Sequence, residues 1–162
     1  MAEEVTVLVA YYSRGGTTKS MAESVAKGVK EAGGEPLLRS VEEVTEDDML
    51  TCKGLILGSP VYFGTMAAPV KEFIDKHIGL RKKMEDKVGA AFVSAGHHTG
   101  GKETTLMSIL QGMLIYGMII VGDPLKASGH YGVACHGNLL EETDNHARML
   151  GARVTEVAGK IF

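Results

Sequence analysis

Residues 5–20 read VTVLVAYYSRGGTTKS and join a short apolar run to a loop rich in Gly, Ser and Thr. The run over residues 5–11 is nearly all apolar and β-branched, as expected of a strand that is covered on both faces. A helix is predicted directly after the loop, because Met21, Val25 and Val29 recur four residues apart. A buried strand, a loop of small residues and a helix, in this order, are typical of α/β proteins that bind a ligand at the loop.

The same alternation of strand and helix continues along the chain. Strands that alternate with helices predict a parallel sheet with right-handed crossovers. Five strands fit one flavodoxin-like three-layer α/β/α domain over residues 1–162, with the strand order 2-1-3-4-5. In that order a ligand is expected at the loops that follow the first, third and fourth strands. After the first strand, the sequence predicts strands at residues 37–41, 54–58, 88–94 and 118–121, helices near residues 69–77, 106–117 and 150–161, and an irregular stretch at residues 122–138.

Composition and charge argue against several classes of partner. The formal net charge of -3 gives no electrostatic reason to expect nucleic acid or an anionic membrane. No apolar run approaches the ~18 residues of a membrane span, and no basic segment precedes an apolar stretch as in a secretory signal. Cys52 and Cys135 stand too far apart for a metal or redox motif, so a reducing, cytoplasmic setting is expected.

The first loop has the composition that a phosphate group requires. Gly15 and Gly16 allow the backbone N–H groups to turn inward. Ser13, Thr17 and Thr18 offer hydroxyl donors beside the N-terminus of a helix. The loop has neither G-x-G-x-x-G nor P-loop spacing, so a monophosphate is expected rather than a dinucleotide. An ordinary β–α turn that is capped by Thr17 or Thr18 is an equal alternative.

The second loop, residues 59–66, reads SPVYFGTM and places two adjacent aromatic residues at the end of a buried strand. A planar tricyclic ring needs apolar faces for stacking and backbone N–H groups at its polar edge. Tyr62 and Phe63 provide such faces in a chain with only 6% aromatic residues, which favours a ligand. The alternative is that both side chains cap the hydrophobic core.

The third loop, residues 94–101, reads SAGHHTGG and offers Ser94, Gly96 and backbone groups to the polar edge of such a ring. His97 and His98 suggest a metal, but adjacent histidines rarely both reach one ion, and no acidic or Cys ligand is near. No metal site is therefore predicted. A second loose cluster lacks the spacing of a metal site in the same way: His130, Cys135 and His136.

The three loops together resemble a known family. The segments that carry the resemblance are Tyr12-Ser13 before a helix beginning Lys19-Ser20-Met21-Ala22, residues 58–66 (GSPVYFGTM), residues 94–97 (SAGH), residues 100–104 (GGKET), residues 117–121 and residues 130–132. In order and spacing they are similar to the tryptophan-repressor-binding-protein-like NAD(P)H:quinone oxidoreductases, and the similarity covers most of the chain. The resemblance implies FMN as cofactor, NAD(P)H and a quinone-like acceptor as substrates, and a homo-oligomer, commonly a homotetramer.

The resemblance also implies roles for individual residues. Tyr116 falls where the family often has a histidine that faces the flavin, and it is predicted to be catalytic. His97 is predicted to be catalytic as well, as a donor at the flavin edge where negative charge develops. With the loop chemistry above, the predicted cofactor-binding residues are Ser13, Arg14, Gly15, Gly16, Thr17, Thr18, Pro60, Val61, Tyr62, Phe63, Gly64, Thr65, Ser94, Ala95, Gly96, His97 and Gly100.

Two departures from the family pattern bear on assembly and on the nicotinamide site. The connection from Val41 to Lys53 lacks an insertion that many members use in assembly, so a homodimer is expected ahead of a homotetramer. Residues 81–83, Arg-Lys-Lys, replace an aromatic residue that the family usually has after the second helix.

Three functions stay open from the residues alone. A flavodoxin-type electron carrier usually has strong acidity around its flavin. This chain instead places basic or titratable residues in or beside the loops, namely Arg14, His97, His98 and Lys102. Positive charge there favours two-electron chemistry, so a ping-pong NAD(P)H:quinone oxidoreductase is expected ahead of the carrier. A regulatory module without turnover is the third alternative.

Overall fold

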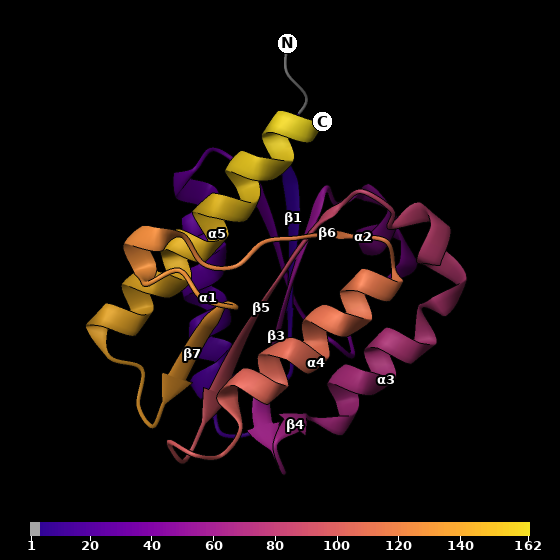
Figure 1. The fold of residues 1–162 in the computed structure, drawn as a ribbon. Helices are drawn as coiled ribbons and strands as arrows, with labels where there is room; N and C mark the ends of the chain where they lie inside the picture. Colours follow the sequence, from indigo (N-terminus) through magenta and orange to yellow (C-terminus); the bar gives the residue numbers. More distant parts are fainter. Residues whose placement is uncertain (1–3) are drawn as a thin grey trace.

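A parallel β-sheet forms the centre of the protein in the computed structural model, which describes residues 4–162 (Figure 1). The sheet order is β2-β1-β3-β5-β6, and all neighbours on this path are parallel. Numbered without the short hairpin strand β4, this is the predicted order 2-1-3-4-5, so the predicted topology is confirmed. The strands on the path are β1 (Thr6–Tyr11), β2 (Glu35–Ser40), β3 (Gly54–Tyr62), β5 (Val88–Ala95) and β6 (Ile119–Ile120).

The fifth position of the sheet is divided between two short strands. β6 pairs with the first two residues of β5, whereas β7 (Val133–His136) pairs in parallel with the last four. Between them the chain leaves the sheet, and the short 3-10 helix η2 (Leu125–Ala127) lies in this excursion. The prediction of an irregular stretch at residues 122–138 was wrong for β7, because only pairing with β5 marks these residues as a strand.

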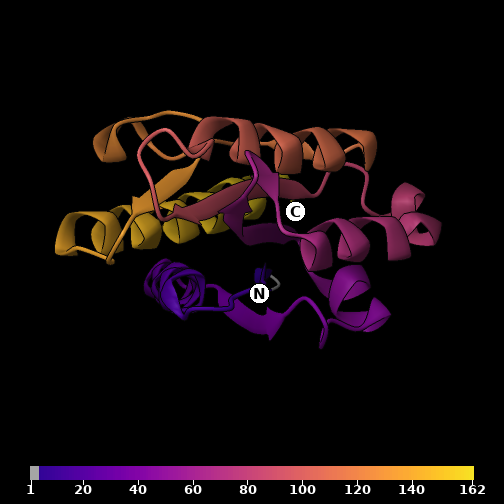
Figure 2. The same cartoon turned by 90° about the horizontal axis from the view of Figure 1, so that it is seen from below.

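Helices cover both faces of the sheet (Figures 1 and 2). α1 and α5 lie on one face, and α2, α3, α4 and the 3-10 helix η1 lie on the other. Leu55 and Leu57 of β3 pack on the α3–α4 side and Ile56 packs on the α1–α5 side, which confirms the predicted three layers. No helix within residues 4–162 is long and apolar enough to cross a membrane. The helices are α1 (Thr17–Glu31), α2 (Glu46–Thr51), α3 (Ala68–Lys76), η1 (Ile78–Lys83), α4 (Lys102–Ile115) and α5 (Glu141–Ile161).

α1 and α5 approach each other closely at two glycines. A Cβ atom on Gly28 would overlap the backbone of Arg148, and a Cβ atom on Gly151 would overlap the backbone of Val25. The two helices therefore pack backbone against backbone, although they come from opposite ends of the described chain. The two helices together cover one face of the sheet, and the first loop leads into α1 on that side.

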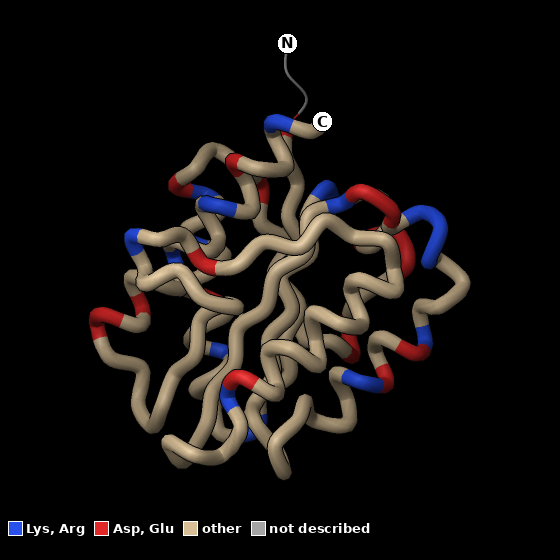
Figure 3. The backbone as a smooth tube through the Cα atoms, in the orientation of Figure 1, with Lys and Arg blue, Asp and Glu red and all other residues tan. Residues whose placement is uncertain are grey.

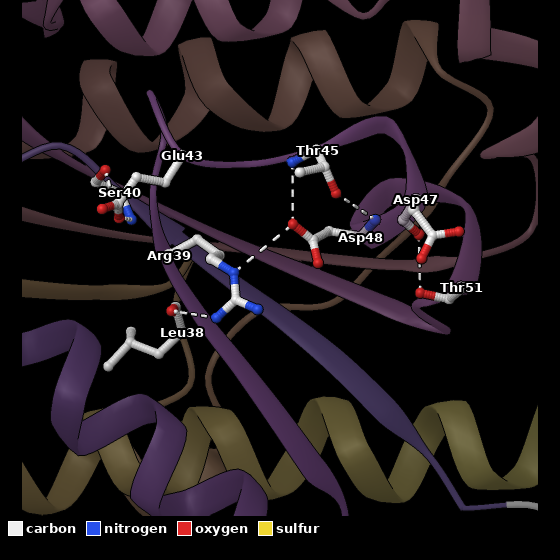
Figure 4. Close-up of polar contacts among 8 residues, drawn as sticks. All are labelled: Leu38, Arg39, Ser40, Glu43, Thr45, Asp47, Asp48 and Thr51. Carbon is white, nitrogen blue, oxygen red and sulfur yellow. Dashed lines mark hydrogen bonds and ion pairs between the residues drawn. The ribbon is translucent and has the colours of Figure 1, made fainter.

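The connection from β2 to α2 is held by a compact set of polar contacts (Figure 4). Thr45 and Asp48 form a capping box, in which the Asp48 N–H donates to Thr45 Oγ1 (3.1 Å) and the Thr45 N–H donates to Asp48 Oδ2 (3.0 Å). Arg39 Nε lies 3.7 Å from the same carboxylate oxygen. Ion pairs near the surface contribute only ~0–1 kcal/mol, so this pair adds little to the free energy of unfolding. The short helix that this capping box begins is α2.

Candidate functional site

The carboxyl ends of β1, β3 and β5 bring the three loops to one edge of the sheet, at the bottom of Figure 1. Thr18 at the start of α1 and Ser94 near the end of β5 are buried, and their hydroxyl oxygens lie 2.7 Å apart. Thr104 of α4 donates its hydroxyl to the Gly64 carbonyl oxygen at 2.6 Å. These two bonds tie the first loop to the third and the second loop to α4, so the three loops form one site.

The first loop leaves the N-terminus of α1 open. Gly16 is the N-cap residue, with a left-handed φ of 99°, and no side chain caps the helix. The Gly16 N–H donates to Ser13 Oγ at 3.1 Å and closes the turn. The alternative of a turn capped by Thr17 or Thr18 is wrong, because both residues lie inside α1 and the Thr18 hydroxyl bonds to Ser94. An uncapped helix N-terminus with adjacent hydroxyl groups fits an anion of the size of phosphate.

Open space borders all three loops. A Cβ atom placed on Gly15, Gly16, Gly64 or Gly96 would have no neighbouring atom within 4 Å. Arg14 and Gly15 are exposed, and Gly16 and Thr17 are half-buried. The backbone of the site is therefore accessible to a ligand.

The second loop is a two-residue hairpin turn. β3 continues through Tyr62 and pairs antiparallel with β4 (Thr65–Met66), so most of the predicted loop is strand. Phe63 (φ 50°) and Gly64 (φ 77°) both have left-handed backbones, the pattern of a type I′ turn. Tyr62 packs partly against the core, but Phe63 is fully exposed in a conformation that is strained for a bulky residue. Capping of the core is therefore the wrong interpretation for Phe63, whose ring is free to contact a ligand.

Ser59 anchors the base of this hairpin. Its buried hydroxyl accepts the Ala67 N–H at 2.9 Å and donates to the Pro60 carbonyl oxygen at 2.7 Å. Pro60 is buried and Val61 is half-buried, so both lie below the exposed turn. The sequence alone did not predict that Ser59 supports the hairpin.

A close approach of the second and third loops was also missed. A Cβ atom on Gly101 would lie 2.7 Å from the Gly64 Cα atom, so the backbones of the two loops are nearly in contact. Thr104 bonds to Gly64 across the same contact. The sequence signal for this contact was the pair Gly100-Gly101 followed by the hydroxyl residues Thr104 and Thr105.

The third loop divides into a buried and an exposed part. Ser94 and Ala95 end β5 and are buried, Gly100 is half-buried, and Gly96 and His97 are exposed. The predicted site residues of this loop therefore line the same edge as those of the first two.

The histidine rings of the third loop have defined partners. His97 Nδ1 lies 3.0 Å from Thr99 Oγ1 and accepts the Thr99 N–H at 3.3 Å, which leaves Nε2 as the donor of the neutral ring. The His98 ring stacks on the His136 ring of β7, with centroids 3.6 Å apart. Within residues 4–162, no group of three or more His, Cys, Asp or Glu residues is arranged to hold a metal ion.

Tyr116 lies at the other end of α4. The helix has 14 residues and so spans ~21 Å, with the third loop before its first residue and Tyr116 after its last. The Tyr116 hydroxyl donates to the Ile74 carbonyl oxygen of α3 at 2.6 Å. Burial, and then the charge of Asp75, raises the pKa of Tyr116 to about 12. The structure does not bring Tyr116 to the three loops of its own chain, and its catalytic role stays a prediction.

Charged residues are sparse at this edge of the sheet, as the lower end of Figure 3 shows. The loops at residues 12–18, 62–65 and 95–101 contain no Asp or Glu. Arg14 in the first loop and Lys102 directly after the third are the basic residues nearby. The three loops themselves therefore lack the acidic residues expected around the flavin of an electron carrier, although exposed Glu103 follows Lys102.

Comparisons with known proteins agree with this geometry. The flavodoxin domain family matches residues 8–112. An NAD(P)H dehydrogenase (quinone) from Archaeoglobus fulgidus is 34% identical, over 96% of this chain and 98% of its own. A flavodoxin from Aquifex aeolicus is 38% identical, over 93% of this chain and 85% of its own. The crystal structure of a flavodoxin, WrbA-like protein from Agrobacterium tumefaciens has a TM-score of 0.85 at 25% identity, covering 97% of this chain and 99% of its own. The chain therefore belongs to the flavodoxin domain family, as a relative of its NAD(P)H dehydrogenase (quinone) and WrbA-like members.

Proposed function

We propose that the protein binds FMN and reduces quinones, or similar two-electron acceptors, with NAD(P)H. The observation that carries this proposal is the open N-terminus of α1 at the same edge of the sheet as an exposed aromatic ring, which fits a phosphate joined to a planar ring system. The full-length similarity to a protein named NAD(P)H dehydrogenase (quinone) supports the reaction. The proposed FMN-binding residues are those of the first loop (Ser13, Arg14, Gly15, Gly16, Thr17 and Thr18), the second (Pro60, Val61, Tyr62, Phe63, Gly64 and Thr65) and the third (Ser94, Ala95, Gly96, His97 and Gly100).

Each loop contributes a different interaction. The N–H groups at the start of α1, with the hydroxyl groups of Ser13 and Thr17, bind the phosphate through charge-assisted hydrogen bonds. Phe63 offers an apolar face to the ring system, and the His97 ring offers its Nε2–H where negative charge develops. Bound FMN supplies the redox chemistry, because it accepts two electrons and donates them to a second substrate.

NAD(P)H and the acceptor use the same exposed edge in turn. The sequence contains no G-x-G-x-x-G fingerprint, and one sheet with its helices accounts for the described chain. Ping-pong kinetics follow, and initial rates with NADH and a benzoquinone are expected to give parallel double-reciprocal lines. Intersecting lines contradict the shared site, and absence of quinone-dependent NADH oxidation contradicts the proposed reaction.

A flavodoxin-type electron carrier is the second candidate, because the Aquifex aeolicus relative at 38% identity is named flavodoxin. The lack of acidic residues in the three loops favours the enzyme. One measurement distinguishes the two functions. The enzyme oxidises NADH in the presence of a quinone without any other protein, whereas the carrier needs a separate reductase to become reduced.

We also propose a homodimer, with a homotetramer as a further assembly of dimers. Two grooves that share Ile115 lie along α4, one against α3 and η1 and one at the C-terminal end of α4, and they expose Ile78, Leu114 and Ile115 by 67%, 57% and 63%. Lys71 and Asp75 form a 2.7 Å ion pair beside the first groove, so both signs of charge border it, which is compatible with a self-complementary two-fold interface. Light scattering of Ile115→Asp is expected to show monomers. A monomeric wild type at micromolar concentration contradicts the homodimer.

A further inference from the structure

A cavity of about 250 Å³ lies beside the third loop, outside the proposed FMN-binding residues. α4, the excursion between β6 and β7, and α5 all contribute to its wall. Leu106 and Val133 give it apolar surface, Tyr131 adds an exposed aromatic ring, and Lys102 and His146 add polar groups. Pockets that enclose a whole drug-sized ligand measure ~300–1,000 Å³, so this cavity suits one part of a larger ligand, such as a nucleoside.

Four basic or titratable side chains lie near the cavity and the third loop, namely His97, His98, Lys102 and His136. The His98 and His136 rings stack with centroids 3.6 Å apart and planes inclined at 30°. Burial and then the charges of His98, Lys102 and His97 lower the pKa of His136. Lys102 also lines the cavity, as does Ala134, which is two residues from His136 on β7 and so faces the same side. The cluster and the cavity are therefore continuous.

These four side chains have no acidic partner. Throughout residues 4–162, no ion pair joins any of them to a carboxylate. Asp123 lines the cavity, but its two oxygens accept the N–H groups of Gly129 (3.1 Å) and His130 (2.8 Å). The other acid of the lining, Glu103, is exposed. The ammonium group of Lys102 and the ring N–H groups of the histidines are thus available to an anionic ligand.

The start of α4 adds to this positive potential. Gly101 is its N-cap residue, and no side chain caps the helix, which is 14 residues long. Its free N–H groups and its dipole favour an anion next to Lys102. A ligand with a strongly charged anionic centre and a nucleoside-sized end fits both the cluster and the cavity.

We propose that the ADP-ribose part of NAD(P)H binds here, with its diphosphate against His98, His136 and Lys102 and its adenosine in the cavity. This inference rests on the proposed function, which requires NAD(P)H as the hydride donor. The diphosphate supplies the negative charge that the cluster lacks. Adenine supplies a planar ring that Tyr131 and Leu106 contact. The chain in this way holds a dinucleotide without the G-x-G-x-x-G fingerprint.

Binding of ADP-ribose to the FMN-loaded protein tests the site without turnover. Titration calorimetry is expected to show that the wild type binds, and that His136→Asn and Lys102→Gln each weaken binding about tenfold or more. Lys160→Gln removes an exposed lysine at the end of α5 and is the matched control, expected to bind as the wild type does. Because the two variants change different elements, a folding defect in one of them does not explain a loss of binding that both share. No binding by the wild type, or equal binding by all four proteins, overturns the inference.

Two hydride donors separate this inference from the proposed function. NADH carries the ADP-ribose part, whereas reduced nicotinamide riboside carries the same nicotinamide without the diphosphate and adenosine. The ratio of kcat/KM for NADH to that for the riboside is expected to fall about tenfold or more in His136→Asn. An unchanged ratio overturns the inference and leaves the proposed function in place. If the wild type oxidises neither donor, the proposed function fails, and the ADP-ribose titration decides the inference.

Discussion

The hydroxyl groups of Thr18 and Ser94 form a buried hydrogen bond of 2.7 Å between the first turn of α1 and the end of β5. Each hydroxyl group is the hydrogen-bond partner of the other. The bond fixes the spacing between the first and third loops, so it links the stability of the fold to the shape of the site.

Thr18→Val is expected to lower the free energy of unfolding of the cofactor-free protein by ~1–3 kcal/mol, because it leaves the buried Ser94 hydroxyl unsatisfied. Urea denaturation followed by circular dichroism measures the change. Thr17→Val is the matched control, since Thr17 is half-buried and forms no side-chain hydrogen bond in residues 4–162. Equal losses in the two variants contradict this role of the buried bond.

Thr17→Val is expected to weaken FMN binding by ~1–3 kcal/mol, because it removes a donor to the phosphate. Riboflavin lacks the phosphate, so its affinity is expected to stay the same in this variant. Titration of the cofactor-free protein, followed by the loss of flavin fluorescence, measures both affinities. A wild type that binds riboflavin as tightly as FMN rules out the phosphate site in the first loop.

His97→Ala is expected to slow reduction by NADH about tenfold or more while FMN stays bound, because a donor to developing negative charge is lost. Stopped-flow absorbance measures the rate. Thr99→Ala keeps the imidazole but removes a hydrogen bond that orients it, so a smaller decrease is expected. A His97→Ala rate equal to that of the wild type removes this residue from the mechanism.

Tyr116→Phe is expected to leave NADH–quinone turnover unchanged and to lower the free energy of unfolding by about 1 kcal/mol. The physical reason is that the Tyr116 hydroxyl donates to the Ile74 carbonyl oxygen, a contact between α4 and α3 away from the loops. Steady-state kinetics and urea denaturation on the same preparation measure both quantities. A large loss of kcat with unchanged stability supports the catalytic role predicted from the sequence.

The affinity for ADP-ribose is expected to rise as the pH falls from about 8 to 6. Burial and then the charges of His98, Lys102 and His97 lower the pKa of His136, so its free ring is mainly neutral at pH 7. A bound diphosphate raises that pKa, binding takes up a proton, and a lower pH therefore favours the complex. Calorimetry in buffers of different ionisation enthalpy measures the proton uptake, which His136→Asn is expected to reduce. Release of protons on binding contradicts the direction of this linkage.

The sequence predicted the topology and the meeting of the three loops, because both depend on features that repeat along the chain. Apolar runs such as residues 5–11 and the helical spacing of Met21 and Val25 mark the elements. Once parallel strands alternate with helices, the order of the sheet places the carboxyl ends together. No contact between distant residues had to be known for this step.

The remaining features depend on contacts that a single sequence does not encode locally. β7 is a strand because its backbone pairs with that of β5. The backbone of Phe63 is left-handed because the β3–β4 pairing requires a two-residue turn. The position of Tyr116 was inferred from the family pattern, and the length of α4 places it far from the loops. The stack of His98 on His136 joins a loop to the missed strand, so it could not be foreseen before β7 was known.

The backbone contact between α1 and α5 at Gly28 and Gly151 has a consequence for how the chain acquires its structure. On a ribosome, β1 and α1 are made before α5, the helix that completes their side of the sheet. Until then, apolar side chains such as Val25 and Val29, which α5 helps to bury, stay open to other chains. Folding of this face is therefore a late, long-range event, and a nascent chain that stalls before residue 141 is expected to be prone to aggregation.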